Sequence, residues 1–446
     1  METSIKDINR TVLGFEATDA LIERRKAVVA NGVSVFVHSS AVRAEAAIIT
    51  DANGNQLIDF GGGIGVLNAG HCPPPVVSAI QKQAAQLIHT CFNVSTYELY
   101  IELCEHLAAL IPHGKATKVM LTNTGAESVE NAIKIARQAT KRQAVICYSE
   151  AFHGRTMMAM TLTSKVNYKT DCGPFAPEVY RLPFPNFYHE GRGLSEDEFS
   201  KQELNKLEEA AHSLVDPKSV AAIIIELVQG EGGFNVAPKK YVRGLRHFCD
   251  KHGIVLIFDE VQSGFCRTGL WAAHHHYGIT PDISTWAKSL GSGMPIGAVL
   301  GKQEIMDAAA VGTIGGTYTG NPVCCAAALA TLQYMKDLDL NHRAKEISQV
   351  VENHFMKLKK RYSCIGDVRG LGAMQAVEFV KNGDPAQPDS QLVESLTKAC
   401  LKRGLLLLSA GTYKNVIRIL SPLVITNEQL DTGLNIIEEE LSKLAH

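Results

Sequence analysis

Six short apolar segments between residues 118 and 301, separated by helical patterns, limit the possible folds of this chain more than any other feature. The segments are KVMLT (118–122), AVICYS (144–149), VAAIIIEL (220–227), GIVLIFDEV (253–261), ISTWA (283–287) and IGAVLG (296–301). Strands with continuous apolar runs are buried on both faces, and helices between them favour a parallel sheet. The sequence therefore predicts an α/β fold with a mostly parallel central sheet flanked by helices.

The two ends of the chain have a different pattern and predict a second, smaller domain. Residues 48–60 predict two short strands around an Asp-Ala-Asn-Gly turn. After about residue 330, long helical patterns alternate with short strands such as 372–380 and 416–420. Because neither end is large alone, we expect them to join. The expected division is a small α+β domain from 1–70 and 329–446, and a large domain over 71–328.

The charge and composition argue against several classes of partner. The 446 residues contain 44 Lys and Arg against 46 Asp and Glu, so no basic surface is expected to attract nucleic acid or a membrane. No segment reaches the roughly 18 apolar residues of a membrane-spanning helix, and the charged start is unlike a signal peptide. Eleven cysteines without a Cys-x-x-Cys pair are typical of reduced thiols, so we expect a cytoplasmic protein with small-molecule partners.

The one sequence candidate for a metal site is the run His274-His275-His276. Adjacent residues of a helix point in different directions, so these imidazoles do not converge on one ion. The run favours a solvated helix end, and we expect no metal.

Thr124 and Glu127 enclose two small residues, Gly125 and Ala126, just before a helical pattern. The spacing predicts a capping box that leaves backbone N–H groups open at a helix N-terminus, where the dipole favours an anion. The apolar face of this helix is predicted to consist of Val129, Ala132, Ile133 and Ala136. The segment is a candidate phosphate site, with an ordinary helix start as the alternative.

Two further segments place a carboxylate and an amine after apolar strands. Asp259 ends one strand, at the edge where open α/β sheets bind ligands. A buried carboxylate requires a partner. That partner is either a ligand or, in the alternative interpretation, a nearby arginine or the N-terminus of the next helix, which Asp259 would cap. Lys288 follows another strand, and partial burial would lower its pKa and make it a nucleophile for Schiff-base chemistry. The alternative is an ordinary solvated lysine.

An anion site, a buried carboxylate and an amine nucleophile are a combination that pyridoxal 5′-phosphate requires. This cofactor has a phosphate, a ring nitrogen that is protonated against a carboxylate, and an aldehyde that reacts with an amine. The three segments together therefore favour a pyridoxal-phosphate enzyme.

The chain resembles the class III (ω-amino-acid) aminotransferases, a group of fold-type-I pyridoxal-phosphate enzymes, over most of its length. The matching segments include DFGGGIGVLNAGH (59–71), TNTGAESVENAIKIAR (122–137), AFHGRTMMAM (151–160), IIIELVQGEGGFNVAP (223–238), IFDEVQSGFCRTG (257–269), AKSLGSGMPIGAV (287–299), GGTYTGNPV (315–323) and VRGLGAMQAVEF (368–379). The resemblance is strongest to the members that act on 4-aminobutyrate.

The resemblance implies which residues would bind the cofactor. Lys288 resembles the Schiff-base lysine, which also moves the proton at the reacting carbon, and Asp259 resembles the carboxylate that holds the pyridinium proton. The other implied contacts are the N–H groups of Gly125 and Ala126 for the phosphate, Gln262 beside the phenolic oxygen, Phe152 and Val261 on the two ring faces, and Thr317 at the phosphate of the neighbouring subunit. The last contact implies a homodimer, with a tetramer left open.

The resemblance also implies which residues would select the substrate. Arg155 resembles the arginine that binds the distal carboxylate of the ω-amino acid, and Arg418 the one that binds the α-carboxylate of glutamate. Glu231 resembles the acidic gate that neutralises the second arginine when the substrate has no α-carboxylate. Ile64 would form an apolar wall of the pocket, and Glu226 is a candidate partner of Arg155.

The activity that the resemblance implies is transfer of the terminal amino group of an ω-amino acid to 2-oxoglutarate, which gives glutamate by a ping-pong mechanism. The first candidate donor is 4-aminobutyrate, which would leave as succinate semialdehyde; ornithine, acetylornithine, 5-aminovalerate and β-alanine stay open. A pyridoxal-phosphate racemase, epimerase or aminomutase is the alternative, although an isomerase needs no second carboxylate acceptor. A non-catalytic pyridoxal-phosphate regulator would bring a basic DNA-binding segment, and none stands out.

Overall fold

The computed structural model describes residues 12–445, which form two compact units. Unit 1 comprises Met1–Pro73 and His342–His446, and unit 2 comprises Pro74–Asn341. No helix among residues 12–445 is long and apolar enough to cross a membrane.

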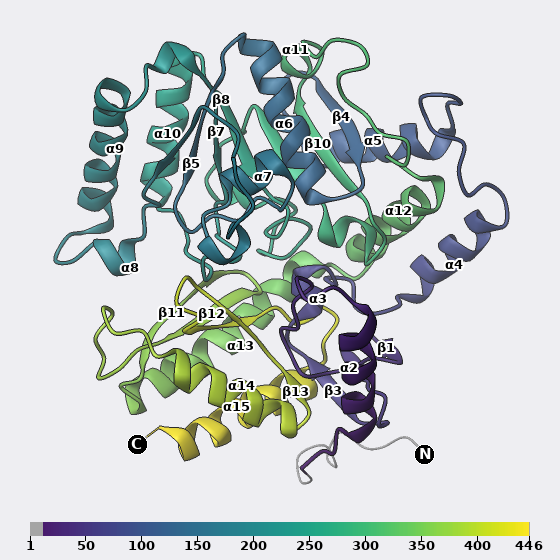
Figure 1. Cartoon of the computed structure of the whole chain (residues 1–446), viewed down its shortest axis with the longest axis vertical. Helices are drawn as coiled ribbons and strands as arrows, with labels where there is room; N and C mark the ends of the chain where they lie inside the picture. The colour runs from purple at the N-terminus through teal and green to yellow at the C-terminus, as the bar shows by residue number, and fades with distance from the viewer. Residues whose placement is uncertain (1–11, 446) are drawn as a thin grey trace. The chain divides into compact units, whose positions relative to one another are not determined.

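Unit 2 is built on a seven-stranded sheet with the strand order β4-β10-β9-β8-β7-β5-β6 (Figure 1). The strands are β4 (Thr117–Thr122), β5 (Ala144–Tyr148), β6 (Val179–Leu182), β7 (Val220–Ile225), β8 (Val255–Asp259), β9 (Ile283–Trp286) and β10 (Gly297–Lys302). Five neighbouring strands, from β9 to β6, are parallel, whereas β10 runs antiparallel to both β9 and β4. The predicted mostly parallel sheet is confirmed, and β10 is its exception.

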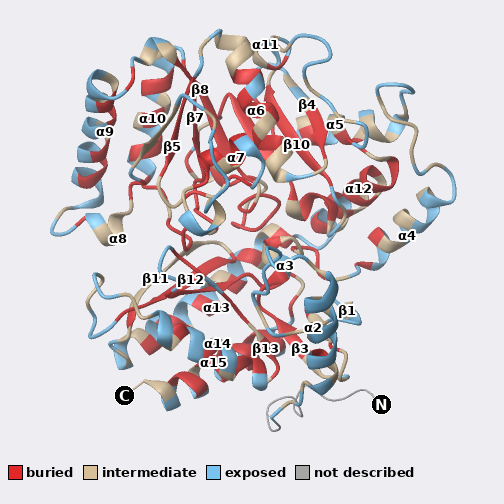
Figure 2. Cartoon of the chain, in the orientation of Figure 1, coloured by how far each residue is buried: buried red, intermediate tan, exposed pale blue. Residues whose placement is uncertain are grey.

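Helices surround this sheet, and their apolar faces complete its core (Figure 1). They are α4 (Pro74–Ala84), α5 (Glu98–Leu110), α6 (Gly125–Thr140), α7 (Met157–Leu162), α8 (Phe187–Glu190), α9 (Glu196–Ser213), α10 (Lys239–His252), α11 (Gln303–Met306) and α12 (Pro322–Asp337). In α6 the predicted apolar face, Val129, Ala132, Ile133 and Ala136, is at most 1% exposed. Strands β5, β7, β8, β9 and β10 are buried nearly throughout (Figure 2), which explains why their sequences do not alternate, whereas β6 and the first half of β4 are less buried.

Unit 1 contains two four-stranded sheets and the remaining helices. One sheet joins β1 (Arg43–Glu45), β2 (Ile48–Thr50), β3 (Gln56–Asp59) and β13 (Leu405–Leu406), and the other joins β11 (Ile365–Leu371), β12 (Met374–Phe379), β15 (Val416–Ile419) and β14 (Leu408–Ala410). The helices are α2 (Glu16–Val28), α3 (Gly62–Gly65), α14 (Ser390–Lys402), α15 (Asn427–Leu444) and α13 (Leu340–Arg361), which begins at the end of unit 2. The predicted hairpin over 48–60 is confirmed as the antiparallel pair β2–β3.

A buried carboxylate organises the glycine-rich segment after β3. Asp59 is 1% exposed, and its Oδ1 accepts hydrogen bonds from the N–H groups of Gly61 (2.7 Å) and Gly62 (2.8 Å). Its Oδ2 lies 2.9 Å from Nε2 of His71. The segment between Asp59 and His71 is therefore held at both ends by one side chain.

The backbone inside this segment takes the left-handed conformation at four consecutive residues, from Gly62 to Gly65. Ile64 is among them with φ 66°, which is rare for a β-branched residue and costs energy. At Gly62 an added Cβ would lie 2.3 Å from the carbonyl oxygen of Leu420, so this position requires glycine for space as well as for its dihedral angle.

The histidine run differs from its prediction as a solvated helix end. It forms a 3₁₀ turn, η3 (Ala273–His276), in which His274 is 2% exposed and its Nδ1 lies 3.0 Å from Oε1 of Glu260. Burial opposes ionisation of Glu260, but the bonds from His274, Ser263 and a backbone N–H outweigh it, and the pKa of Glu260 is lowered. The solvated interpretation is therefore wrong for His274. Within residues 12–445 no group of three His, Cys, Asp or Glu side chains is placed to hold a metal ion.

Gly62→Ala is expected to lower the midpoint of thermal unfolding more than Gly54→Ala. Both glycines have positive φ, so either alanine is strained by roughly 1–2 kcal/mol. A Cβ at Gly54 meets open space, whereas a Cβ at Gly62 meets a backbone carbonyl, so Gly62→Ala should cost about 2 kcal/mol more. Melting curves followed by circular dichroism measure the difference, and equal shifts would contradict the expectation.

Candidate active site

Asp259 and Lys288 leave the central sheet at the ends of two adjacent parallel strands. Asp259 is the last residue of β8 and is paired in register with Thr285 of β9. Lys288 begins the short turn η4 (Lys288–Gly291), two residues after β9 ends. The carboxylate and the amine are therefore placed by neighbouring strands at the same edge of the sheet.

Other predicted residues follow strands that end at this edge. Glu226 comes directly after β7, Phe152 follows β5, and Thr124 follows β4. Since β10 is antiparallel to β9 and β4, the carboxyl end of β4 lies at the same edge. The candidate site is thus built by the segments after five strands of unit 2.

The buried carboxylate of Asp259 is held by three donors. It is 5% exposed; its Oδ1 accepts from Oγ1 of Thr285 and from the N–H of Val261, both at 3.1 Å. Its Oδ2 lies 2.7 Å from Nδ1 of His153, whose side chain is fully buried. The protein partner is therefore a histidine and not the arginine of the alternative interpretation.

His153 is one residue that the sequence analysis missed. It lies within AFHGR, between Phe152 and Arg155, both of which were predicted. Its Nε2 is buried and has no hydrogen-bond partner in the described part of the chain. The signal available in the sequence was a histidine in a matched motif at the predicted edge.

The start of α6 has the features of an anion site. Oγ1 of Thr124 accepts from the N–H of Glu127 (3.2 Å), which confirms Thr124 as the cap. The carboxylate of Glu127 accepts from the N–H of Asn123 (2.8 Å) and not from that of Thr124, so the predicted capping box is only half formed. Between residues 12 and 445, no acceptor is bonded to the N–H groups of Gly125 and Ala126.

Two glycines bring the predicted segments into contact. A Cβ on Gly125 would lie 2.9 Å from Cγ1 of Val261 and 3.6 Å from Cβ of Ala287, the residue before Lys288. A Cβ on Gly154 would lie 2.6 Å from Cβ of Ala126. The phosphate segment therefore packs on the segments that carry Asp259, Lys288 and His153, and a larger residue at either glycine would separate them.

Lys288 itself has φ +47°, a left-handed conformation that is uncommon for a residue with a side chain. Such strain costs of order 1–3 kcal/mol and persists only where the surroundings enforce it. Here the surroundings are Ala287, which packs near Gly125, and the turn η4. Strained residues cluster at functional sites, which agrees with the predicted role.

Gln262 lies buried beside the loop after β7. A Cβ on Gly230 would lie 2.4 Å from Oε1 of Gln262, so the amide is packed directly on this glycine. Oε1 is buried and has no hydrogen-bond partner among residues 12–445. A buried amide without its bond is expected where a ligand group completes the site.

Glu226 fixes the backbone of two loops. Its Oε2 accepts from the N–H of Phe152 (2.9 Å) and its Oε1 from the N–H of Gly230 (3.0 Å). No ion pair joins it to Arg155 within the described residues. The candidate contact with Arg155 is therefore replaced by a contact with the backbone of the same motif.

Burial raises the pKa of Glu226 to about 7; the charge of His153 opposes this shift and that of Asp259 adds to it. Two buried carboxylates and one histidine thus influence one another beneath the site. The carboxyl group of Glu226 is therefore partly protonated near neutral pH, mainly because it is buried.

Arg155 lies over aromatic rings. Its Cζ is 4.8 Å from the ring centre of Tyr168 and 5.9 Å from that of Phe152. The two rings meet edge to face at 5.1 Å, and the hydroxyl of Tyr168 donates to Oε2 of Glu231 (3.3 Å). The structure therefore brings together Arg155, Phe152 and Glu231, and it adds Tyr168, which the sequence analysis did not name.

Three predicted residues are not brought to this group by the contacts within unit 2. Thr317 is exposed on the segment between α11 and α12. Ile64 and Arg418 belong to unit 1; Arg418 is 3% exposed in β15, where it pairs in register with Ala376. Their roles stay predictions.

The arrangement fits the predicted cofactor. It offers two unbonded N–H groups at a helix start, a buried carboxylate at a strand end, a buried amide three residues after that carboxylate, and a lysine after the next strand. These groups match a phosphate, a protonated ring nitrogen, a phenolic oxygen and an aldehyde.

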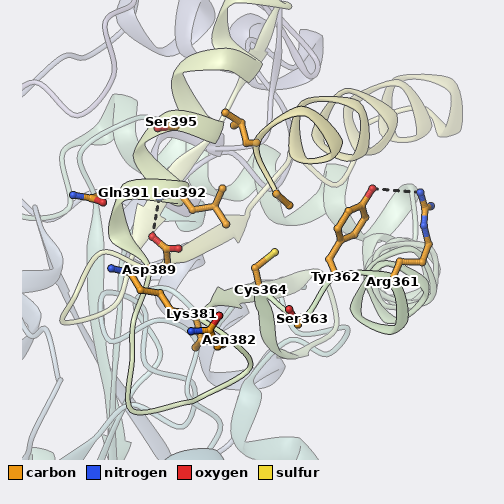
Figure 3. A pocket seen from close by; sticks show the side chains of 13 residues that line it. Arg361, Tyr362, Ser363, Cys364, Lys381, Asn382, Asp389, Gln391, Leu392 and Ser395 are labelled. Atoms are coloured by element: carbon orange, nitrogen blue, oxygen red, sulfur yellow. Dashed lines mark hydrogen bonds between the residues drawn. The ribbon is translucent and has the colours of Figure 1, made fainter.

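A separate pocket of about 650 Å³ lies entirely in unit 1. Residues at the ends of α13 and α15 and at the start of α14 line it, among them Cys364 and Asp389 (Figure 3). The carboxylate of Asp389 accepts from the N–H of Leu392 and so caps α14. None of the predicted site residues lines this pocket.

Comparison with known proteins agrees with the geometry. Residues 28–441 match the model of the family described as aminotransferase class-III. The probable 4-aminobutyrate aminotransferase of Bacillus subtilis (strain 168) is 45% identical over 420 residues, which are 94% of this chain and 96% of that protein. The 5-aminovalerate aminotransferase of Pseudomonas aeruginosa is 44% identical over 431 residues, 96% of this chain and 100% of that protein.

A solved structure agrees with the fold. The taurine:2-oxoglutarate aminotransferase of Bifidobacterium kashiwanohense, in complex with PLP and glutamate, has a TM-score of 0.89 and 27% identity, over 97% of this chain and 99% of that chain. The resemblance and the fold class inferred from the sequence are confirmed. This chain belongs to the class III aminotransferases, which depend on pyridoxal 5′-phosphate.

Proposed function

We propose that this aminotransferase moves the terminal amino group of an ω-amino acid, with 4-aminobutyrate as the first candidate, to 2-oxoglutarate by a ping-pong mechanism. The main support for the proposal is the placement of Asp259 and Lys288 at the ends of adjacent strands. Gly125 packs between Val261, which follows Asp259, and Ala287, which precedes Lys288. Relatives named for 4-aminobutyrate and for 5-aminovalerate support an ω-amino acid as the donor.

The residues of the chain have distinct tasks in this proposal. Bound pyridoxal phosphate supplies an aldehyde and an electron sink. Gly125 and Ala126 bind the phosphate, and Asp259, oriented by His153, holds the proton of the ring nitrogen. Lys288 supplies the amine and then takes the proton from the carbon that carries the amino group.

Phe152, Val261 and Gln262 complete the proposed binding of the cofactor. Phe152 and Val261 cover the two faces of the ring, and the amide of Gln262 bonds to its phenolic oxygen. The contact of Val261 with Gly125 supports a position beside the phosphate segment.

Arg155 is proposed to bind the distal carboxylate of the substrate. In the described structure no carboxylate is paired with it, and its guanidinium lies on aromatic rings, so its N–H groups remain available for a bidentate bond. Arg418 is proposed for the α-carboxylate of glutamate, with Glu231 as its removable counter-charge and Ile64 as an apolar wall.

A homodimer is proposed because of the surface around Thr317. Val311, Tyr318 and Val94 are 105%, 65% and 79% exposed. The amide of Asn321 donates to the carbonyl of Ile88, and the rings of His89 and Tyr318 lie 5.2 Å apart, so residues 88–94 and 311–321 form one partly apolar surface. Such a surface suits an interface, and it would present Thr317 to the cofactor phosphate of a second subunit.

Lys288→Ala is expected to lower turnover at least about a thousandfold, because amine and proton transfer are lost together. Borohydride should no longer fix the cofactor to the protein, as judged by the mass of the peptide that contains residue 288. The control Lys115→Ala removes an exposed lysine of the same unit and should leave both unchanged. Retained turnover in Lys288→Ala would refute the proposed chemistry.

Glu231→Gln is expected to lower kcat/KM for 4-aminobutyrate about tenfold or more and to change kcat/KM for glutamate much less. In this variant residue 231 no longer neutralises Arg418 when the substrate has no α-carboxylate, and weaker neutralisation of a buried charge costs roughly 1–3 kcal/mol. Half-reactions of the holoenzyme with each donor measure the two values. An equal effect on both donors would contradict the gate.

A comparison of amino donors separates the remaining candidate substrates. The proposal expects 4-aminobutyrate to exceed 5-aminovalerate, ornithine, acetylornithine and β-alanine in kcat/KM with 2-oxoglutarate as acceptor. Without a keto acid the enzyme should stop after one half-reaction, whereas an isomerase would continue.

A further inference from the structure

One aromatic side chain links the two groups that the proposed function assigns to the selection of carboxylates. Tyr168 ends the 3₁₀ turn η1 (Val166–Tyr168) and is half-buried. Its ring lies beneath the guanidinium of Arg155, and its hydroxyl donates to the carboxylate of Glu231 at 3.3 Å.

We propose that Tyr168 is a positioning residue that sets substrate specificity, because its ring holds Arg155 and its hydroxyl receives Glu231 when that carboxylate leaves Arg418. The inference rests on the proposed function and assigns it one further residue. Ring and hydroxyl act on opposite charges, so their effects can be separated by substitution.

The ring suits Arg155 better than an acidic partner would. A carboxylate would occupy the N–H groups of the guanidinium and compete with the substrate, whereas the face of a ring attracts the cation and leaves these donors open. The edge-to-face contact with Phe152 fixes the ring of Tyr168, and Glu226 in turn fixes the backbone of Phe152. The guanidinium therefore rests on a platform that its own motif supports.

The hydroxyl suits a carboxylate that must change partners. When glutamate or 2-oxoglutarate brings a second carboxylate, the gate requires Glu231 to leave its arginine, and a hydrogen-bond donor nearby lowers the cost of that exchange. The hydroxyl of Tyr168 is a donor already directed at Oε2 of Glu231. The long bond of 3.3 Å is one that the carboxylate can exchange readily.

Two substitutions separate the two contributions. Tyr168→Phe keeps the ring and removes the hydroxyl, so KM for glutamate and 2-oxoglutarate should rise about tenfold while kcat/KM for 4-aminobutyrate changes less than about twofold. Tyr168→Leu removes the platform as well, so kcat/KM should fall about tenfold or more for every donor. Compared with Tyr168→Leu, Tyr168→Phe should therefore restore the use of 4-aminobutyrate but not the use of glutamate.

Tyr180→Phe is the matched control. Its hydroxyl also donates to a glutamate, Oε2 of Glu178 at 3.0 Å, but on the edge strand β6 and outside the site. This variant should leave both half-reactions unchanged. The readout for all variants is the single-turnover absorbance change of the holoenzyme with each donor.

The outcomes distinguish the inference from the function on which it rests. A wild-type enzyme that converts neither donor overturns the proposed function and the inference with it. A wild-type enzyme active on both donors, with Tyr168→Phe unchanged or equally impaired on both, overturns the inference alone. A loss confined to glutamate and 2-oxoglutarate supports it.

Discussion

The negative charge of Asp259, buried at the end of a strand, is the constraint on which the rest of the site depends. A buried carboxylate is stable only with donors around it, and its three donors come from three different segments: Thr285, Val261 and His153. Each segment also carries another proposed functional group, since Lys288 follows Thr285, Gln262 follows Val261 and Arg155 follows His153. Satisfying one charge therefore brings the amine, the amide and the guanidinium to one edge of the sheet.

Unit 2 stabilises its charged side chains in two different ways. Beneath the sheet edge, Asp259 and Glu226 are buried and accept hydrogen bonds from protein donors, which fixes the loops that carry these donors. Toward the substrate, Arg155 is held by rings and not by a counter-ion. The first arrangement gives rigidity, and the second keeps a positive charge ready for an anion. The same motif, AFHGR, supplies a residue to each.

Much of the fold and part of the site follow from local sequence. Apolar runs and the stripe on α6 identify strands and a helix because burial is visible in composition. Composition does not reveal direction, so β10 was not recognised as antiparallel, and the half-buried β6 was missed. His153, Tyr168 and the pairing of His274 with Glu260 were missed for another reason: each depends on a partner from a distant segment. The family resemblance suggested the roles of the site residues, and the structure showed which side chains from distant segments contact them.

The pairing of β3 with β13 has a consequence for biosynthesis. Ile58 of β3 is opposite Leu405 of β13, so β3 is synthesised early and its neighbour is synthesised more than three hundred residues later. On the ribosome, unit 2 is synthesised in full between them and can fold first, while the earlier segment remains without its sheet neighbour. Pairing of β3 with β13, rather than formation of the seven-stranded sheet, would then be the later step, and a chain stalled before β13 would expose β3 as an open edge to chaperones.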